Sequence, residues 1–140
     1  MIVPARTPEE RQFLVSYIAA KLKLTPQDLI GQMPFEVMVV MGKCGPIGAV
    51  LYTDYRTDDI QITCAGEPGW VSRRTLRQAF AYPFEQLNCR RVTCVAHRKN
   101  KYMRSYLLRM GFQLEGVKRK ALNGSDLMIY GLLKEEQKWA

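Results

Sequence analysis

The chain has 140 residues, of which 47% are hydrophobic, 10% aromatic and 24% charged, a composition typical of a folded globular protein and not of a disordered segment. Its length predicts one domain over residues 1–140. No apolar run reaches the roughly 18 residues of a membrane span, no secretory segment opens the chain, and the four cysteines fit neither a disulfide framework nor a CxxC pair. These features predict a reduced, cytoplasmic protein that holds no metal and does not bind membranes.

The chain begins with two predicted helices. Thr7 can cap the first helix, Pro8 suits its first position, and Glu10 can complete a capping box. Residues 25–28, which like the start of the first helix begin with Thr-Pro, predict a second, short helix that ends near Gly31. The predicted buried face of the first helix consists of apolar residues at helical spacing: Phe13, Leu14, Tyr17, Ile18 and Leu22.

Three extended segments follow, over residues 36–41, 47–55 and 60–64. The last of them alternates apolar and polar side chains, as a strand with one buried face does. A Gly-rich turn over residues 66–69 closes this part of the chain.

The second half alternates helix and strand. A helix is predicted over residues 72–87, with Pro83 expected to remove its hydrogen bond to Ala79 and to kink it. A strand over 91–96, a helix over 101–110 and two strands over 112–121 and 126–133 follow. Asn123-Gly124 predicts a tight hairpin between the last two strands. The order predicts an α/β (α+β) domain with a mixed, mostly antiparallel central sheet flanked by helices.

Positive charge is concentrated in one part of the chain. The net charge is +8, yet residues 71–120 alone carry thirteen basic and two acidic residues, and the remainder is slightly acidic. This distribution predicts an anionic ligand or partner, such as a phosphorylated cofactor, nucleic acid or an acidic protein surface. The basic residues are Arg73, Arg74, Arg77, Arg90, Arg91, Arg98, Lys99, Lys101, Arg104, Arg109, Lys118, Arg119 and Lys120.

An ordered set of residues in the second half carries a family resemblance. Asn100 stands eleven residues before the Gly111-Phe112 pair. The other matching positions are Tyr82, Phe84, Glu85, Leu87, Arg91, Val92, Glu115-Gly116, Arg119, Asp126, Tyr130 and Leu132-Leu133. In this order and spacing the chain resembles the GNAT superfamily of N-acetyltransferases, most closely the branch that acetylates ribosomal and other protein N-termini and small amines.

The resemblance implies a splayed central strand pair with coenzyme A in the gap and the pyrophosphate at the start of the following helix. A helix N-terminus suits this group because its free N–H groups and dipole favour anions. The cofactor-binding residues it implies are Ile62 and Thr63 on the strand, Trp70, Val71, Ser72, Arg73 and Arg74 at the helix start, and Asn100 and Arg104 from the next helix.

Two parts of the chain depart from the family pattern. In the phosphate loop, Glu67 replaces a glutamine or arginine and Trp70 replaces a glycine. Seven residues after Asn100, where many members have a tyrosine as general acid, this chain has Leu107, and the adjacent Tyr106 is expected to point to another side of the helix.

The activity implied by the resemblance is transfer of an acetyl group from acetyl-CoA to a primary amine by direct attack in a ternary complex. The expected acceptor is an amine-bearing small molecule or protein substrate, and the chain is expected to be a monomer or homodimer. Glu36, Asp59 and His97 are candidate bases, and the general acid is unassigned. Cys64 and Cys94 lie on predicted strands and are expected to be buried apolar residues, not nucleophiles.

Two alternatives remain open at this point. Because Glu67 and Trp70 alter the phosphate loop, the protein could be a relative that has lost catalysis and binds nucleic acid or an acidic partner through its basic half. It could also be a subunit whose substrate pocket is completed at a dimer interface.

Overall fold

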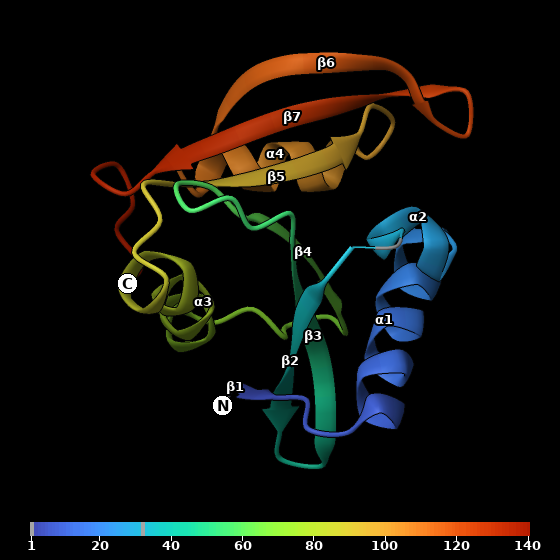
Figure 1. The fold of residues 1–140 in the computed structure, drawn as a ribbon, viewed down its shortest axis with the longest axis vertical. Coiled ribbons are helices and arrows are strands. Elements are labelled where there is room, and N and C mark those ends of the chain that lie inside the picture. The colour runs from blue at the N-terminus through green and yellow to red at the C-terminus, as the bar shows by residue number, and fades with distance from the viewer. Residues whose placement is uncertain (1, 32) are drawn as a thin grey trace.

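The computed structural model describes residues 2–31 and 33–140, which form a seven-stranded sheet with helices on both faces (Figure 1). The strand order is β1-β2-β3-β4-β5-β7-β6, and β4 and β5 are the parallel neighbours in a sheet that is otherwise antiparallel. The predicted fold class is therefore confirmed. The elements are β1 (Ile2–Pro4), α1 (Pro8–Leu22), α2 (Pro26–Ile30), β2 (Phe35–Gly42), β3 (Gly45–Thr53), β4 (Gln61–Gly66), α3 (Arg73–Ala81), the π-helical turn η1 (Tyr82–Gln86), β5 (Arg91–His97), α4 (Lys101–Arg109), β6 (Gln113–Leu122) and β7 (Ser125–Leu133).

Side-chain caps begin the first two helices as predicted. The Thr7 hydroxyl accepts the Glu10 N–H at 3.1 Å, although the Glu10 carboxylate accepts the N–H of Arg6 and not that of Thr7. At α2, Thr25 and Asp28 form both bonds of a capping box, each near 3 Å. Within the described part of the chain, no helix is both long and apolar enough to cross a membrane.

The buried face of α1 differs by one position from the predicted one. Phe13 is 64% exposed, so its assignment to the buried face was wrong. Residues four apart lie on one face of a helix. The face of α1 that meets the sheet therefore holds two adjacent residues from each of two successive turns. The buried residues of α1 are Leu14, Val15, Ile18 and Ala19.

The helix predicted over residues 72–87 is two elements, because the α-helical pattern ends before Pro83. The chain widens into η1, where the Leu87 N–H donates to the Tyr82 carbonyl five residues earlier, at 3.0 Å. Pro83 cannot donate to the Ala79 carbonyl. The buried Tyr52 hydroxyl donates to that carbonyl at 2.6 Å instead, so a strand side chain replaces the missing helical bond.

The sheet separates two apolar cores. In β3, Val50 and Tyr52 join the core beneath α3 and α4, whereas Ala49 and Leu51 join the core beneath α1. Alternate side chains of a strand point to opposite faces, which explains the division. In Figure 1, α1 and α3 accordingly lie on either side of β2–β4.

The parallel strands β4 and β5 pair at one end and then separate. Gln61 opposite Thr93 is the one register pair described between them, and the Thr93 N–H donates to the Ile60 carbonyl at 2.9 Å. Asp59 accepts the Thr93 hydroxyl at 2.8 Å and lies 3.4 Å from Arg91, which closes this end. Beyond it, β5 runs across β4 rather than alongside it (Figure 1), so the expected splayed strand pair is present.

Candidate active site

A cleft of about 770 Å³ opens where β4 and β5 diverge. Residues of the α1–α2 segment, β4, α3, β5, α4 and the β6–β7 hairpin line it. Much of its inner wall is apolar, formed by side chains such as Leu76, Phe80, Met103, Leu107 and Phe112. The cleft can therefore take a long ligand with an apolar stem between the two halves of the sheet.

The edge of β4 offers unpaired backbone groups to the cleft. Because the Ile60 carbonyl faces β5, the alternation of a strand turns the backbone groups of Ile62 and Cys64 to the same side. No β5 partner is described beyond the Gln61–Thr93 pair, so the N–H and C=O of Cys64 face the gap. They can bind an extended amide-containing chain as another strand would.

The start of α3 lies at the rim of the cleft. Val71 lines the cleft, and Ser72 caps the helix by accepting the Thr75 N–H at 3.1 Å. The N–H groups of Arg73 and Arg74 belong to the first turn and have no partner within the helix. This terminus therefore combines free donors, the positive end of the helix dipole and two guanidinium groups.

Trp70 packs against the sheet at the position where the family pattern has a glycine. Its indole ring covers Gly48 of β3 and Gly66 of β4, where an added Cβ would come within 2.8 Å and 2.5 Å of the ring. Trp70 also lines the cleft. The indole thus forms part of the wall, fitted to two positions without side chains.

Glu67, the other departure in this loop, is tied to α1. Its carboxylate lies 3.0 Å from the Lys21 ammonium and accepts the Tyr17 hydroxyl at 3.0 Å. The hydrogen bonds from Lys21 and Tyr17 hold the pKa of Glu67 below its usual value. The acidic side chain is therefore neutralised by α1, which leaves the positive character of the α3 terminus in place.

The structure divides the predicted cofactor-binding residues into three groups. Ile62, Thr63, Trp70, Val71 and Asn100 line the cleft. Ser72, Arg73 and Arg74 follow directly on Val71 at the start of α3, outside the described lining. Arg104 lines a separate recess beside the cleft.

Of the three candidate bases, the structure brings His97 to the cleft. Its Nδ1 accepts the Lys99 N–H at 3.2 Å, so the neutral ring carries its proton on Nε2 and offers a donor there. Glu36 pairs with Arg11 at 3.4 Å, and Asp59 accepts the Thr93 hydroxyl, and neither is among the described residues that line the cleft.

Two tyrosines that the sequence did not single out as site residues line the cleft. Tyr102 and Tyr106 stack on α4 with ring centroids 6.2 Å apart. The expectation that Tyr106 points elsewhere was wrong, because both it and the nearly buried Leu107 reach the cleft. Burial raises the pKa of Tyr106, so its hydroxyl is neutral at physiological pH. The signal available in the sequence was the i, i+4 spacing of the two rings.

The thiols in the cleft are protonated. Burial raises the pKa of Cys64 to about 11, and burial likewise raises that of Cys94. A thiolate is the nucleophilic form of cysteine, so neither residue is prepared to accept an acyl group at neutral pH. Cys94 is buried as expected, whereas Cys64 is half-buried at the cleft wall.

The fold is that of the GCN5-related N-acetyltransferases. A mutant spermidine N-acetyltransferase (SpeG) from Vibrio cholerae superposes with a TM-score of 0.73 at 17% identity, covering 95% of this chain and 94% of that chain. A GCN5-related N-acetyltransferase from Brucella melitensis gives 0.70 at 20% identity (96% and 76% covered), and the ribosomal-protein-S5-alanine acetyltransferase from Vibrio fischeri 0.63 at 18% (97% and 80%). No protein-family model matches the sequence, and no curated protein matches it. The resemblance inferred from the sequence is thus confirmed in the fold.

Proposed function

We propose that this protein transfers an acetyl group from acetyl-CoA to a primary amine. The observation that carries the proposal is the cleft at the β4–β5 divergence, with an unpaired strand edge on one wall and the start of α3 at its rim. The shared fold of solved N-acetyltransferases agrees with this activity.

The residues present fit coenzyme A. The open backbone groups of Cys64 suit the amides of the pantetheine arm, and the apolar wall suits its methylene segments. The free N–H groups and guanidinium groups of Arg73 and Arg74 suit the pyrophosphate. When bound, acetyl-CoA supplies an acyl group activated as a thioester.

Direct transfer is favoured because neither thiol among the described lining residues, Cys64 or Cys94, is a prepared nucleophile. The Cys64 N–H can donate to the acyl carbonyl oxygen, where negative charge grows as the amine attacks. The neutral Tyr106 hydroxyl is a donor for the departing sulfur, and His97 can donate from Nε2. The amine attacks, the C–S bond breaks, and the proton lost by the amine balances the one gained by the thiol.

The cleft also favours amines that lose their proton easily. Asp28 is the carboxylate among the described lining residues, and its Oδ2 accepts the Thr25 N–H in the capping box of α2. At pH 7 roughly a tenth of an α-amine with a pKa near 8 is neutral, against less than about one in a thousand lysine-type amines with a pKa near 10.4. Because the one carboxylate among the described lining residues belongs to a helix cap, α-amines such as peptide N-termini, which need less help from a base, are the better acceptors.

The alternative of a nucleic-acid-binding relative without catalysis is not favoured. Glu67 and Trp70, the two residues that motivated it, contact α1 and the glycines of the sheet respectively and leave the cleft open.

The test is release of free thiol from acetyl-CoA with an α-amine peptide, a lysine side-chain analogue and a polyamine as acceptors. We expect the α-amine to react fastest. Val71→Asp places a carboxylate just before α3, where the helix dipole favours negative charge but where the carboxylate would repel a bound pyrophosphate. This change should raise the KM for acetyl-CoA about tenfold or more. Val117→Asp, the same change at an exposed site on β6, is the control. No thiol release above background with any amine would contradict the proposal.

A further inference from the structure

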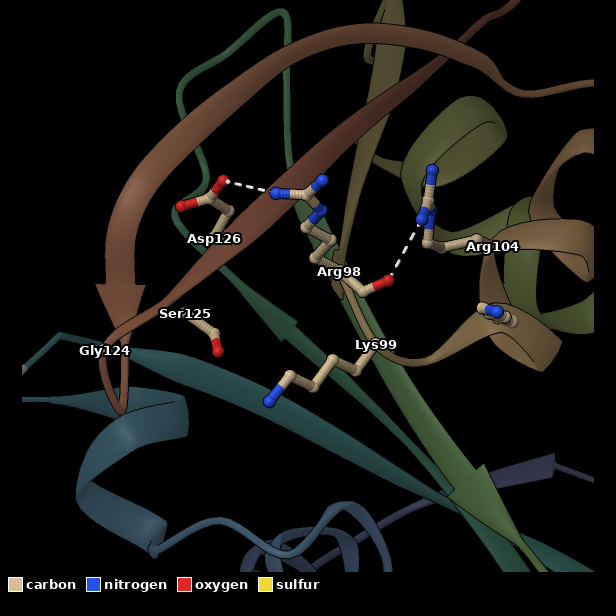
Figure 2. A pocket seen from close by; sticks show the side chains of 7 residues that line it. Arg98, Lys99, Arg104, Gly124, Ser125 and Asp126 are labelled. Carbon is tan, nitrogen blue, oxygen red and sulfur yellow. Dashed lines mark hydrogen bonds and ion pairs between the residues drawn. The ribbon is translucent and has the colours of Figure 1, made fainter.

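A second recess, of about 520 Å³, adjoins the cleft between the β5–α4 turn and the start of β7 (Figure 2). Lys99 lines both the recess and the cleft. In Figure 2 its ammonium extends toward Ser125, while the Arg104 guanidinium lies beside the Arg98 carbonyl. The lining consists of Arg98, Lys99, Lys101, Arg104, Gly124, Ser125 and Asp126.

Positive charge in this recess is largely uncompensated. Four of the seven lining residues are basic, and Asp126 is the acidic one. One Asp126 carboxylate oxygen accepts the backbone N–H of Lys120 at 3.0 Å, and the other lies 3.5 Å from the Arg98 guanidinium, the limit of a hydrogen bond. An anion entering the recess therefore meets a surplus of three positive charges.

Arg104 is held in position before any ligand arrives. Its Nε donates to the hydroxyl of the buried Tyr130 at 3.0 Å, and Nη1 donates to the Arg98 carbonyl at 3.0 Å. These bonds use two of the five donors of a guanidinium group and fix its plane. Three donors, on Nη1 and Nη2, remain for phosphate oxygens, and the side chain loses little entropy on binding because it is already held.

Lys99 and Lys101 add cations at the start of α4, next to the Asn100 cap. The positive end of the helix dipole makes this an unfavourable place for positive charge. The two lysine charges therefore lower the stability of the free protein, and a bound anion would offset their repulsion from the helix dipole.

We infer that the recess is a binding site for a phosphate group. Four cations around one recess, with one carboxylate among them, suit the charge of a phosphate group. The site does not depend on the proposed acetyl transfer. Because Lys99 connects the recess to the cleft, the phosphate can belong to the 3′-phosphate of coenzyme A or to a separate phosphorylated ligand.

The test is isothermal titration of pyrophosphate into the full chain and two variants. Lys101→Ala removes one cation of the recess and should raise Kd about tenfold, while removal of a charge that opposes the helix dipole leaves Tm unchanged or higher. Lys118→Ala, which removes an exposed cation of β6 outside the recess, should leave Kd nearly unchanged. Equal effects of the two variants, or no binding at millimolar pyrophosphate, would overturn the inference.

Coenzyme A and dephospho-coenzyme A distinguish the two sources. If the 3′-phosphate occupies the recess, Lys101→Ala weakens binding of coenzyme A but not of the dephospho form, and coenzyme A displaces pyrophosphate. If the ligand is separate, pyrophosphate binds the coenzyme A complex and the variant binds both cofactors normally. Either pattern supports a phosphate site, and the first requires that the proposed cofactor binds.

Discussion

Asn100 combines a structural bond with a place in the cleft. Its Oδ1 accepts the Met103 N–H at 3.1 Å and so caps α4, while the residue lines the cleft. Asn100→Ala should therefore lower the free energy of unfolding by about 1 kcal/mol even without ligand. Asn100→Ser keeps a capping oxygen and should lower the free energy of unfolding by only about a few tenths of a kcal/mol. Urea denaturation measures both, and equal losses would show that the cap is not the cause.

The four thiols differ in environment, which predicts their order of reaction. Cys44 is exposed, whereas burial raises the pKa of Cys64 to about 11 and also raises those of Cys89 and Cys94. Iodoacetamide near pH 8 should label one thiol quickly and the other three slowly. Cys44→Ser should abolish the fast phase. Two or more fast-reacting thiols in the native protein would contradict the assigned burial.

Cleft residues on strands and at helix starts were easier to predict from the sequence than cleft residues on helix faces. Ile62 and Asn100 were predicted to reach the cleft and do so. Tyr106 was not, because neighbouring helical residues differ by about 100° in direction and the rotation of α4 is decided by packing against the sheet. That packing buries Leu107 and leaves Tyr106 at the cleft.

At the scale of elements, local signals located most helices and strands to within a residue or two, because caps, turns and alternation act over a few residues. Two features depend on distant contacts. The three residues of β1 form a strand only by pairing with β2. The π-helical turn at Pro83 depends on Tyr52, which lies 27 residues before Ala79, to satisfy the Ala79 carbonyl.

The attachment of α1 to the end of β4 should depend on pH through Glu67. The Lys21 and Tyr17 bonds lower the pKa of Glu67 in the folded state, so they stabilise the fold above its ordinary value of 4.5 and are lost as pH falls through the lowered folded value. Glu67→Gln should be less stable than wild type at pH 7, and the difference should shrink below pH 4.5. Thermal unfolding from pH 3 to 7 measures this.

Glu135→Gln is the matched control, since Glu135 is an exposed carboxylate outside the described ion pairs. The account of α1 would be wrong if Glu67→Gln and Glu135→Gln followed the same stability curve across this pH range.

In the whole molecule, the basic residues of 71–120 are divided among separate places. Part of it lies at the start of α3, at the rim of the cleft, and part lines the recess beside α4. Other members pair with acids, as Arg91 does with Asp59 and Glu115. The sequence could predict an anionic ligand but not this division, because the recess joins residues of β5–α4 to the β6–β7 hairpin through the fold.

The divergence of β4 and β5 is the feature on which the proposed activity depends, and binding of acetyl-CoA tests it most directly. Isothermal titration of acetyl-CoA into the wild-type protein should give one site per chain, with affinity reduced about tenfold or more in Val71→Asp and unchanged in Val117→Asp. Saturating ligand at about 100 times its Kd should also raise stability by roughly 2.7 kcal/mol. Absence of binding at millimolar acetyl-CoA in a folded protein would contradict the account.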